Sequence, residues 1–418
     1  MRSILRVFPN RFFASLALFG LIAGLVTSKV MLSVATITIM CNAFININAA
    51  ENFKKWFSDK TSLLLLSIFI IYLLSGFYSS DMGYWVDRCR MKLPFLAIPL
   101  GFTAIRKFTQ KMFFTWLAVY FFTITIASLV VFINYLFHFD EFNRRLSQGQ
   151  PIPAPLNDHI RFSIEIAFAI ITGAYLYFNH FFTRRIMKIM SLLSILFLVI
   201  FIHVFAVRTG IVALYFTAIV LLVRWVILKK QYLRAFISLA GIVIIALLSI
   251  QFIPSLHNRM GYFKYEMELI RKGELNPEHS DAQRILSMEY GWDIAKNNLW
   301  TGTGAGDIKN EMDSLYHQYA GDVKLKSKLP HNQFIYVFAA TGLIGLIIFL
   351  IAVFYPWLSK KRYLHPLYTS FFCLILFSFL TEHTLEIQIG TAYYLLFLLL
   401  IKKYIDDTDA EQLKEAHA

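Results

Sequence analysis

Charged residues are scarce in this chain of 418 residues, since Asp, Glu, Lys and Arg together fill only 16% of its positions. Hydrophobic residues fill 57%, and aromatic residues alone fill 17%. A soluble domain of this size cannot hide so much apolar surface. Apolar runs near the length of a bilayer span, separated by short charged segments, are typical of helical membrane proteins. The sequence therefore predicts an all-α, polytopic membrane protein.

Cysteine is also scarce, and Cys41, Cys89 and Cys373 show neither a disulfide framework nor metal-ligand spacing. The run Gly302-Thr303-Gly304-Ala305-Gly306 follows no predicted strand, which disfavours a dinucleotide site. Asp407-Thr408-Asp409 resembles the metal-binding triplet of nucleotide-sugar transferases, but we expect the polar tail from Asp406 to Ala418 to be disordered. We therefore assign no metal ligand.

The formal net charge is +14, with 40 basic residues against 26 acidic ones. No basic stripe interleaved with aromatic residues occurs in a soluble segment, so we expect no nucleic-acid partner. The basic residues instead lie between apolar runs, which is typical of loops held in the cytoplasm.

Grouping the apolar runs by length predicts about twelve transmembrane helices. Arg2, Arg6 and Arg11 precede the first run, and no small-residue cleavage site follows it, so we expect a retained span with a cytoplasmic N-terminus. An even count places both termini in the cytoplasm. The predicted centres are near Leu18, Ile37, Phe69, Ile98, Thr123, Ala169, Ile195, Ala218, Val243, Gly342, Leu374 and Leu396.

This topology predicts four regions: helices 1–9 in residues 1–253, an outer helical loop in 254–330, helices 10–12 in 331–403, and a cytoplasmic tail in 404–418. The outer loop is too long for a simple turn. Ser280 and Asp281 can cap a helix that runs to about Lys296. A second helix is expected from Lys309 to about Tyr319, so the loop should form a small helical cap.

Two arginines are candidate anion-binding residues. Arg208 lies between two apolar runs with almost no loop, where a guanidinium is costly unless it snorkels to the interface or meets an anion. Arg284 lies in the first turn of the predicted loop helix, and its position alone favours a solvated charge. Both alternatives stay open at this point.

His331 follows Pro330 and precedes an apolar span. Imidazole exchanges a proton near neutral pH, and a helix N-terminus attracts anions. The alternative is a histidine that serves only polar packing. Gly342 and Gly345, further along the span, predict close packing between helices.

Further candidates for substrate binding lie at the outer ends of spans. Arg88, Arg90 and Lys92 are suited to bind a phosphate, or they are interfacial anchors.

Two other spans carry such candidates as well. His159 and Arg161 open one span from the outside, and Glu382 closes another, where it is expected to share a helical face with Glu386.

Three of these elements follow one another in a recognisable order. Arg208 separates two spans, and Arg284 heads a helix that leads to Trp300-Thr301-Gly302-Thr303-Gly304. His331-Asn332 then opens a span with Thr341-Gly342-Leu343-Ile344-Gly345-Leu346. From about Phe201 to Phe349 the chain resembles the O-antigen ligase and O-antigen polymerase superfamily, and it is most similar to the ligases.

The resemblance implies an inverting, metal-independent glycosyltransferase without a cofactor. It would move a glycan from undecaprenyl pyrophosphate to lipid A-core in lipopolysaccharide biosynthesis, among the lipids of the bacterial inner membrane and at its periplasmic face. Arg208 and Arg284 would bind the pyrophosphate, and His331 would be the catalytic residue near the acceptor. The alternatives are an O-antigen polymerase, a protein O-oligosaccharyltransferase and, in another class, a polysaccharide transporter, which would carry ionisable residues at mid-depth of several spans.

Overall fold

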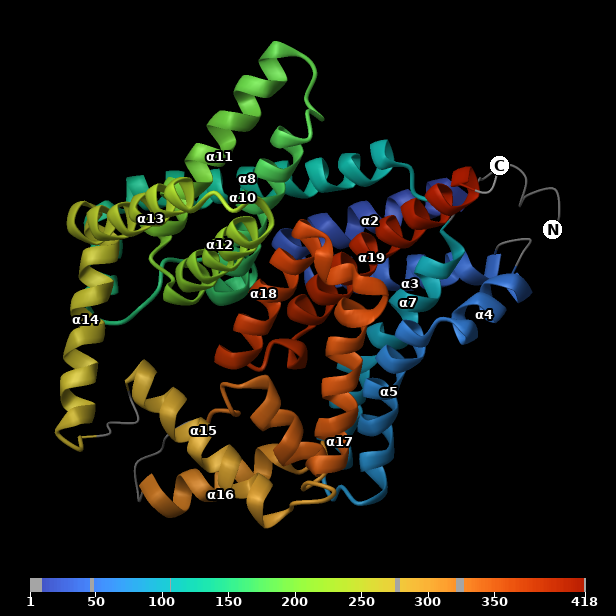
Figure 1. Ribbon diagram of the computed structural model, residues 1–418. Helices are drawn as coiled ribbons and strands as arrows, with labels where there is room; N and C mark the ends of the chain where they lie inside the picture. Colours follow the sequence, from blue (N-terminus) through green and yellow to red (C-terminus); the bar gives the residue numbers. More distant parts are fainter. Residues whose placement is uncertain (1–9, 46–48, 106, 275–278, 321–326, 417–418) are drawn as a thin grey trace. The chain divides into compact units, whose positions relative to one another are not determined.

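The computed structural model describes residues 10–45, 49–105, 107–274, 279–320 and 327–416. Within these ranges every regular element is a helix, so the predicted all-α fold is confirmed (Figure 1). The chain forms two compact units. The first unit contains residues 1–116, 284–368 and 379–418, and the second contains residues 117–283 and 369–378.

The first unit is built mainly from the two ends of the chain. Its helices are α2 (Asn10–Thr27), α3 (Lys29–Ile45), α4 (Ala49–Ser58), α5 (Lys60–Leu74), α6 (Met82–Lys92), α7 (Pro94–Ala104), α16 (Ile308–Ala320), α17 (Gln333–Leu358) and α19 (Gln388–Ala416). The second unit contains α9 (Phe139–Ser147), α10 (His159–Phe178), α11 (Arg185–Phe205), α12 (Arg208–Lys229), α13 (Tyr232–Phe252) and α14 (Pro254–Arg271). Three helices have residues in both units: α8 (Gln110–Phe137), α15 (Ser280–Asn297) and α18 (Pro366–Thr381).

Seven helical segments of the described residues are long and apolar enough to cross a membrane, and an eighth is added if α3 and α4 form one bent span. Helices α2 and α18 are shorter apolar helices. The protein is therefore a multi-pass membrane protein. All twelve predicted span centres lie within helices, while the number of spans and their orientation stay predictions, as does the division into four regions.

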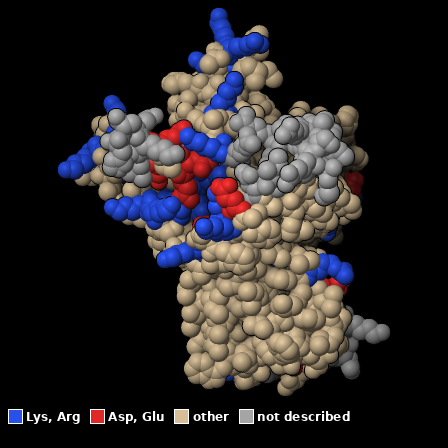
Figure 2. Space-filling model, turned by 90° about the vertical axis from the view of Figure 1, so that its right-hand side faces the viewer, with Lys and Arg blue, Asp and Glu red and all other residues tan. Residues whose placement is uncertain are grey.

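Large apolar side chains cover much of the surface. On α13, for example, the exposed fractions of Leu233, Phe236 and Ile237 are 72%, 70% and 60%. Figure 2 shows one face on which charged side chains gather in one area, beside a broad area without them. Such exposure suits a hydrocarbon solvent, since contiguous apolar patches of this kind are rare on soluble monomers.

The predicted helices of the long loop are present. Helix α15 begins at Ser280 and ends at Asn297, and α16 covers Ile308–Ala320. Helix α14 starts the loop with Pro254 in its first turn, where the missing N–H of proline costs no hydrogen bond.

Helix α17 is interrupted at Gly342, where φ is 66° and ψ is −172°. This conformation is open almost only to glycine. An ideal Cβ at Gly342 would lie 2.2 Å from the carbonyl oxygen of Trp300. The prediction that Gly342 packs against another helix is therefore wrong, because it packs against the backbone of a loop.

The loop that follows α15 bonds the backbone groups released by this interruption. Two of its N–H groups donate to α17 carbonyls before Gly342, and two of its carbonyls accept α17 N–H groups after it. The four bonds are Thr303 N–H to Ala339 O (3.0 Å), Gly304 N–H to Ala340 O (3.0 Å), Leu343 N–H to Leu299 O (2.8 Å) and Ile344 N–H to Trp300 O (3.4 Å). The glycine-rich run therefore serves as a backbone partner for α17.

The expected disorder of the tail is wrong for residues 406–416, because they continue helix α19. The carboxylate of Asp406 accepts hydrogen bonds from Arg362 at 2.7 and 2.9 Å. The carboxylate of Asp407 accepts the backbone N–H of Phe108 at 2.8 Å. These contacts with distant parts of the first unit hold the polar segment in place.

We predict that Gly342→Ala destabilises the protein by at least about 1 kcal/mol, because alanine is strained at this φ and its Cβ meets the Trp300 carbonyl. Thermal unfolding in detergent measures the effect. Gly241→Ala is the matched control, since this glycine of α13 has no neighbouring atom within 4 Å of an added Cβ. Equal unfolding temperatures for the two variants would contradict the role given to Gly342.

Candidate active site

Arg284 lies on α15 and forms an ion pair with Glu382, with 3.2 Å between the guanidinium and a carboxylate oxygen. The Arg284 side chain is only 26% exposed, and that of Glu382 is 3% exposed. Arg284 is therefore a partly buried, paired cation and not a solvated charge on a helix surface.

His331 lies beside Ser287, which follows Arg284 by one helical turn. The Ser287 hydroxyl oxygen is 3.1 Å from Nδ1 of His331, and it also accepts the backbone N–H of His331 at 3.3 Å. The Ser287 hydroxyl donates to the carbonyl of Arg284 at 2.9 Å. Ser287 thus bonds His331 to α15, one helical turn after Arg284.

Two local features fix the start of α17 near α15. Asn332 caps the helix, because its side-chain oxygen accepts the N–H groups of Phe334 and Ile335 at 2.9 and 3.1 Å. Gly291 of α15 lies against Pro330, since an added Cβ would be 2.5 Å from the proline ring. The missing side chain therefore lets α15 approach the residue before His331.

A second imidazole lies next to His331. The rings of His331 and His383 are nearly perpendicular, with centroids 5.6 Å apart. Nδ1 of His383 lies 3.2 Å from the carbonyl oxygen of Pro330. Sequence analysis does not assign Ser287 or His383 to the site, because neither belongs to a motif with defined spacing.

Glu382 and Glu386 do not share a helical face, so that prediction is wrong. Helix α18 ends at Thr381, and Glu386 belongs to the separate 3-10 turn Thr384–Glu386. Helix α18 ends just before Glu382, the residue that pairs with Arg284. The carboxylates of Glu382 and Glu386 can therefore bind different cations.

Glu386 is the centre of a buried polar cluster. One of its carboxylate oxygens lies 2.6 Å from Nζ of Lys92, and it accepts hydrogen bonds from the Tyr72 hydroxyl at 2.7 Å and the Gln333 amide at 3.0 Å. Burial lowers the pKa of Lys92, and the attraction of Glu386 opposes this shift. This ion pair ties α6 to the turn that follows α18.

The three basic residues of α6 have different surroundings. Lys92 and Arg88 are one turn apart on the same face, and Arg88 donates to the carbonyl of Glu386 at 3.3 Å. Arg90 lies on another face, where it is exposed and pairs with Asp87 at 3.3 Å. Their predicted role in substrate binding stays a prediction.

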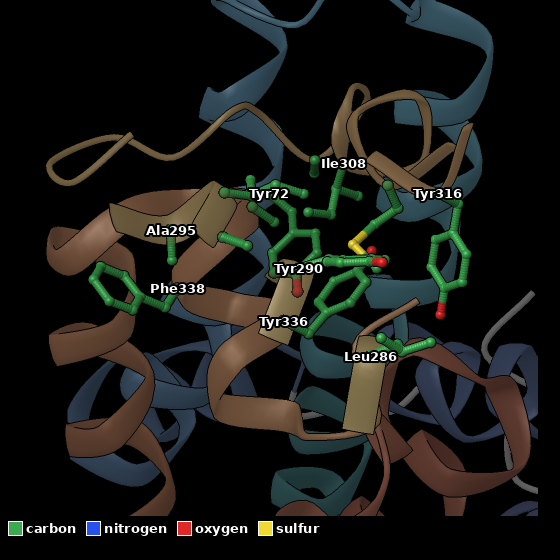
Figure 3. Close-up of a cluster of buried hydrophobic side chains, with 13 residues drawn as sticks. Tyr72, Leu286, Tyr290, Ala295, Ile308, Tyr316, Tyr336 and Phe338 are labelled. Atoms are coloured by element: carbon green, nitrogen blue, oxygen red, sulfur yellow. The ribbon is translucent and has the colours of Figure 1, made fainter. Parts of the chain in front are cut away.

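A cluster of buried aromatic and aliphatic side chains from α5, α15, α16 and α17 supports this region. Tyr72, Tyr290 and Tyr336 point toward one another in Figure 3. Tyr290 and Tyr316 pack edge to face, with ring centroids 5.0 Å apart. The loop helices are thus anchored to membrane helices by a shared core.

Arg208 is described within the second unit, where it starts α12. One of its guanidinium nitrogens lies 2.6 and 2.9 Å from the two carboxylate oxygens of Asp281. Its guanidinium also covers the Phe263 ring at 4.4 Å from the centroid. Ala206 ends α11 with a left-handed φ of 54°, which produces the tight connection before Arg208.

A second carboxyl group lies beside Asp281. Glu266 of α14 is 1% exposed, and it accepts the Asp281 backbone N–H and the Ser280 hydroxyl, both at 3.3 Å. Burial raises the pKa of Glu266, and the hydrogen bond between its carboxyl group and the Asp281 carboxyl group raises it further, whereas the Asp281 backbone N–H opposes this shift.

His159 and Arg161 lie in the first turn of α10, also within the second unit. Asp158 caps this helix by accepting the Arg161 N–H at 3.1 Å, and it pairs with the Arg161 guanidinium at 3.4 Å. Arg161 is 7% exposed. The substrate-binding role of both residues stays a prediction.

Residues 193–350 match the O-antigen ligase family. The resemblance predicted from the sequence is thereby confirmed for this segment, which contains Arg208, Arg284 and His331. Members of this family are glycosyltransferase-like enzymes that act on lipid-linked glycans. No curated protein matches the chain.

The O-antigen ligase segment supplies Arg284, Ser287 and His331 to one cluster of the first unit, and Glu382 and His383 complete it from outside the matched residues. The structure therefore brings His331, Arg284 and Glu382 together. Their catalytic and binding roles stay predictions.

We predict that the stability of the Glu266→Gln protein falls less with rising pH than the stability of the wild type. Because the pKa of Glu266 is raised in the folded protein, the folded state keeps a proton that the unfolded chain releases near the usual value of 4.5. The stability contributed by this group is therefore lost as pH rises from 4.5 through the folded pKa. Unfolding temperatures in detergent across this window should decline less for Glu266→Gln than for the wild type.

The control for this measurement is Glu268→Gln, on the same helix. Glu268 is 67% exposed and pairs with Lys272, so its substitution should leave the decline in place. Identical pH dependence for the wild type and Glu266→Gln would contradict the assigned protonation of Glu266.

Proposed function

We propose that this chain is an O-antigen ligase, an inverting glycosyltransferase that moves a glycan from undecaprenyl pyrophosphate to lipid A-core. The observation that carries this proposal is that Ser287, one helical turn after Arg284, bonds His331 to α15 within the segment that matches the O-antigen ligase family. The residue that carries a cation suited to the leaving group and the residue that carries a base suited to the acceptor thus meet at one helix.

The proposed reaction breaks the bond between the anomeric carbon and the pyrophosphate, and the bonding electron pair leaves with the lipid pyrophosphate. Negative charge then develops on the leaving group. Guanidinium groups stabilise such charge through forked hydrogen bonds, without a divalent ion. We assign this role to Arg284 and, from the resemblance, to Arg208.

His331 removes the proton of the acceptor hydroxyl as the acceptor oxygen bonds to the anomeric carbon. Attack from the side opposite the pyrophosphate inverts the configuration of that carbon. General base catalysis of this kind contributes about 10²- to 10⁴-fold to the rate. The proton from the acceptor ends on the imidazole, so the step is balanced without a cofactor.

We place this reaction at the periplasmic face of the bacterial inner membrane, with both termini in the cytoplasm. Basic clusters between apolar runs support this orientation, for example Arg184, Arg185 and Lys188. In the proposed topology the loop helices α15 and α16 then meet the lipid-linked donor on the periplasmic side.

Purified protein should transfer a lipid-linked glycan to lipid A-core without added metal and in the presence of chelator. We predict that His331→Ala lowers the transfer rate by about 10²- to 10⁴-fold, because the acceptor loses its base. Arg284→Lys should lower the transfer rate by about 10²- to 10³-fold, because lysine keeps the charge but lacks the forked N–H donors of a guanidinium.

The matched controls are His317→Ala on α16 and Arg271→Lys on α14, both at exposed positions, which should transfer at the wild-type rate. Normal turnover by His331→Ala would remove its catalytic role. Loss of transfer on chelation would contradict metal-independent stabilisation of the leaving group.

Deletion of the gene separates the proposed ligase from its alternatives. We predict lipopolysaccharide without O-antigen and an intact lipid-linked polymer, because only the transfer to lipid A-core is lost. Electrophoresis of lipopolysaccharide and analysis of the lipid-linked pool measure both. Capping by a single repeat would indicate a polymerase, and unchanged lipopolysaccharide with lost protein glycosylation would indicate a protein O-oligosaccharyltransferase.

A further inference from the structure

Ser287 has three polar neighbours, and their chemistry fixes the direction of each hydrogen bond. A serine hydroxyl has one proton to donate and two lone pairs. The Arg284 carbonyl at 2.9 Å can only accept, so it takes the hydroxyl proton. The His331 backbone N–H at 3.3 Å can only donate, so it takes one lone pair.

One lone pair of Ser287 then remains for Nδ1 of His331, which lies 3.1 Å away. With the Ser287 proton donated to the Arg284 carbonyl, a hydrogen bond between Ser287 and Nδ1 requires a proton on Nδ1. In the neutral imidazole, the lone pair is therefore on Nε2. Ser287 is fully buried, and water does not compete for its hydroxyl.

We propose that Ser287 is a positioning residue that holds the His331 imidazole as the Nδ1–H tautomer and so makes Nε2 the atom that takes the proton of the acceptor hydroxyl. This inference rests on the proposed function for its catalytic consequence. The tautomer itself follows from the hydrogen bonds of the protein alone.

Ser287 also sets the place of the imidazole relative to Arg284. The two residues are one turn apart on α15 and share a helical face. Because Ser287 bonds both the ring and the backbone N–H of His331, the ring cannot rotate without losing a buried hydrogen bond. The imidazole is therefore held against α15, one turn from the residue that we assign to the leaving group.

The same argument from donors and acceptors applies to His383, the neighbouring histidine. Nδ1 of His383 lies 3.2 Å from the Pro330 carbonyl, which only accepts, so that nitrogen also carries a proton. Its ring packs edge to face against His331 at 5.6 Å. This contact limits the movement of the His331 ring.

The first test reads the tautomer directly by nitrogen-15 NMR of protein with labelled histidine, without substrate. The chain has 11 histidines, and the signals of His331 are identified by their absence from His331→Gln protein. We expect a protonated Nδ1 and an unprotonated Nε2 in the wild type. In Ser287→Ala we expect the ring to shift toward the Nε2–H tautomer. A wild-type ring protonated on Nε2 would overturn the proposal.

The second test is kinetic. Ser287→Ala should lower kcat by about 10- to 100-fold, by analogy with the loss found when a partner that orients a metal-bound histidine is removed. KM for the lipid-linked donor should stay unchanged, because Arg284 is retained. Ser287→Thr, which keeps the hydroxyl, should recover both the tautomer and most of the rate, and thermal unfolding confirms that each variant is folded.

Wild-type kcat and an unchanged tautomer in folded Ser287→Ala would overturn the role of Ser287. The same would follow if Ser287→Thr regained the rate without regaining the tautomer. A wild-type protein without transferase activity would overturn the proposed function, whereas the NMR measurement would still decide the hydrogen-bond assignment.

Discussion

Backbone groups inside an apolar environment need hydrogen-bond partners, and this requirement governs the region around α17. The interruption at Gly342 releases carbonyl and N–H groups that lipid cannot satisfy. The loop that follows α15 supplies the missing partners through Leu299, Thr303 and Gly304. This pairing fixes the loop against α17, and it therefore also fixes α15 relative to the start of α17, where His331 lies.

The cations assigned to the pyrophosphate are each paired with a carboxylate inside their own unit. Arg284 pairs with Glu382, and Arg208 pairs with Asp281. A partly buried guanidinium without a counter-charge would be costly, so each carboxylate offsets the charge of its arginine. A pyrophosphate that binds as proposed must share or replace these carboxylates. Binding at either arginine is then an exchange of anions at a guanidinium that is held within its own unit.

Local signals in the sequence predicted the elements whose ends are determined locally. Helices α15 and α16 agree with the prediction within a residue or two, because capping residues and glycines mark their ends. The end of α18 was missed, since it depends on Arg284, which lies 98 positions from Glu382. The helical structure of the tail also depends on a long-range contact and was not predicted, because Arg362 binds Asp406 from 44 positions away.

The site shows the same division between local and long-range information. Arg284 and His331 were found because their motifs resemble a family, whereas Ser287 belongs to no motif. A serine on a helix most often bonds its own backbone or water, and only the fold places His331 beside it. Gly342 was recognised as a small residue, but packing against a helix and packing against a loop have the same sequence signal.

The surroundings of Arg208 argue against the alternative in which it is only an interfacial anchor. A snorkelling arginine keeps its guanidinium in water, whereas the side chain of Arg208 is 19% exposed and bonded to Asp281. Val207 precedes α12 and its side chain caps no N–H group, so the first turn also presents the positive end of the helix. The Arg208 guanidinium already binds a carboxylate, and a phosphate oxygen has the same charge sign and accepts the same hydrogen bonds. Lysine in place of Arg208 would lose both the fork and the planar contact with Phe263, so the residue type itself supports an anion-binding role.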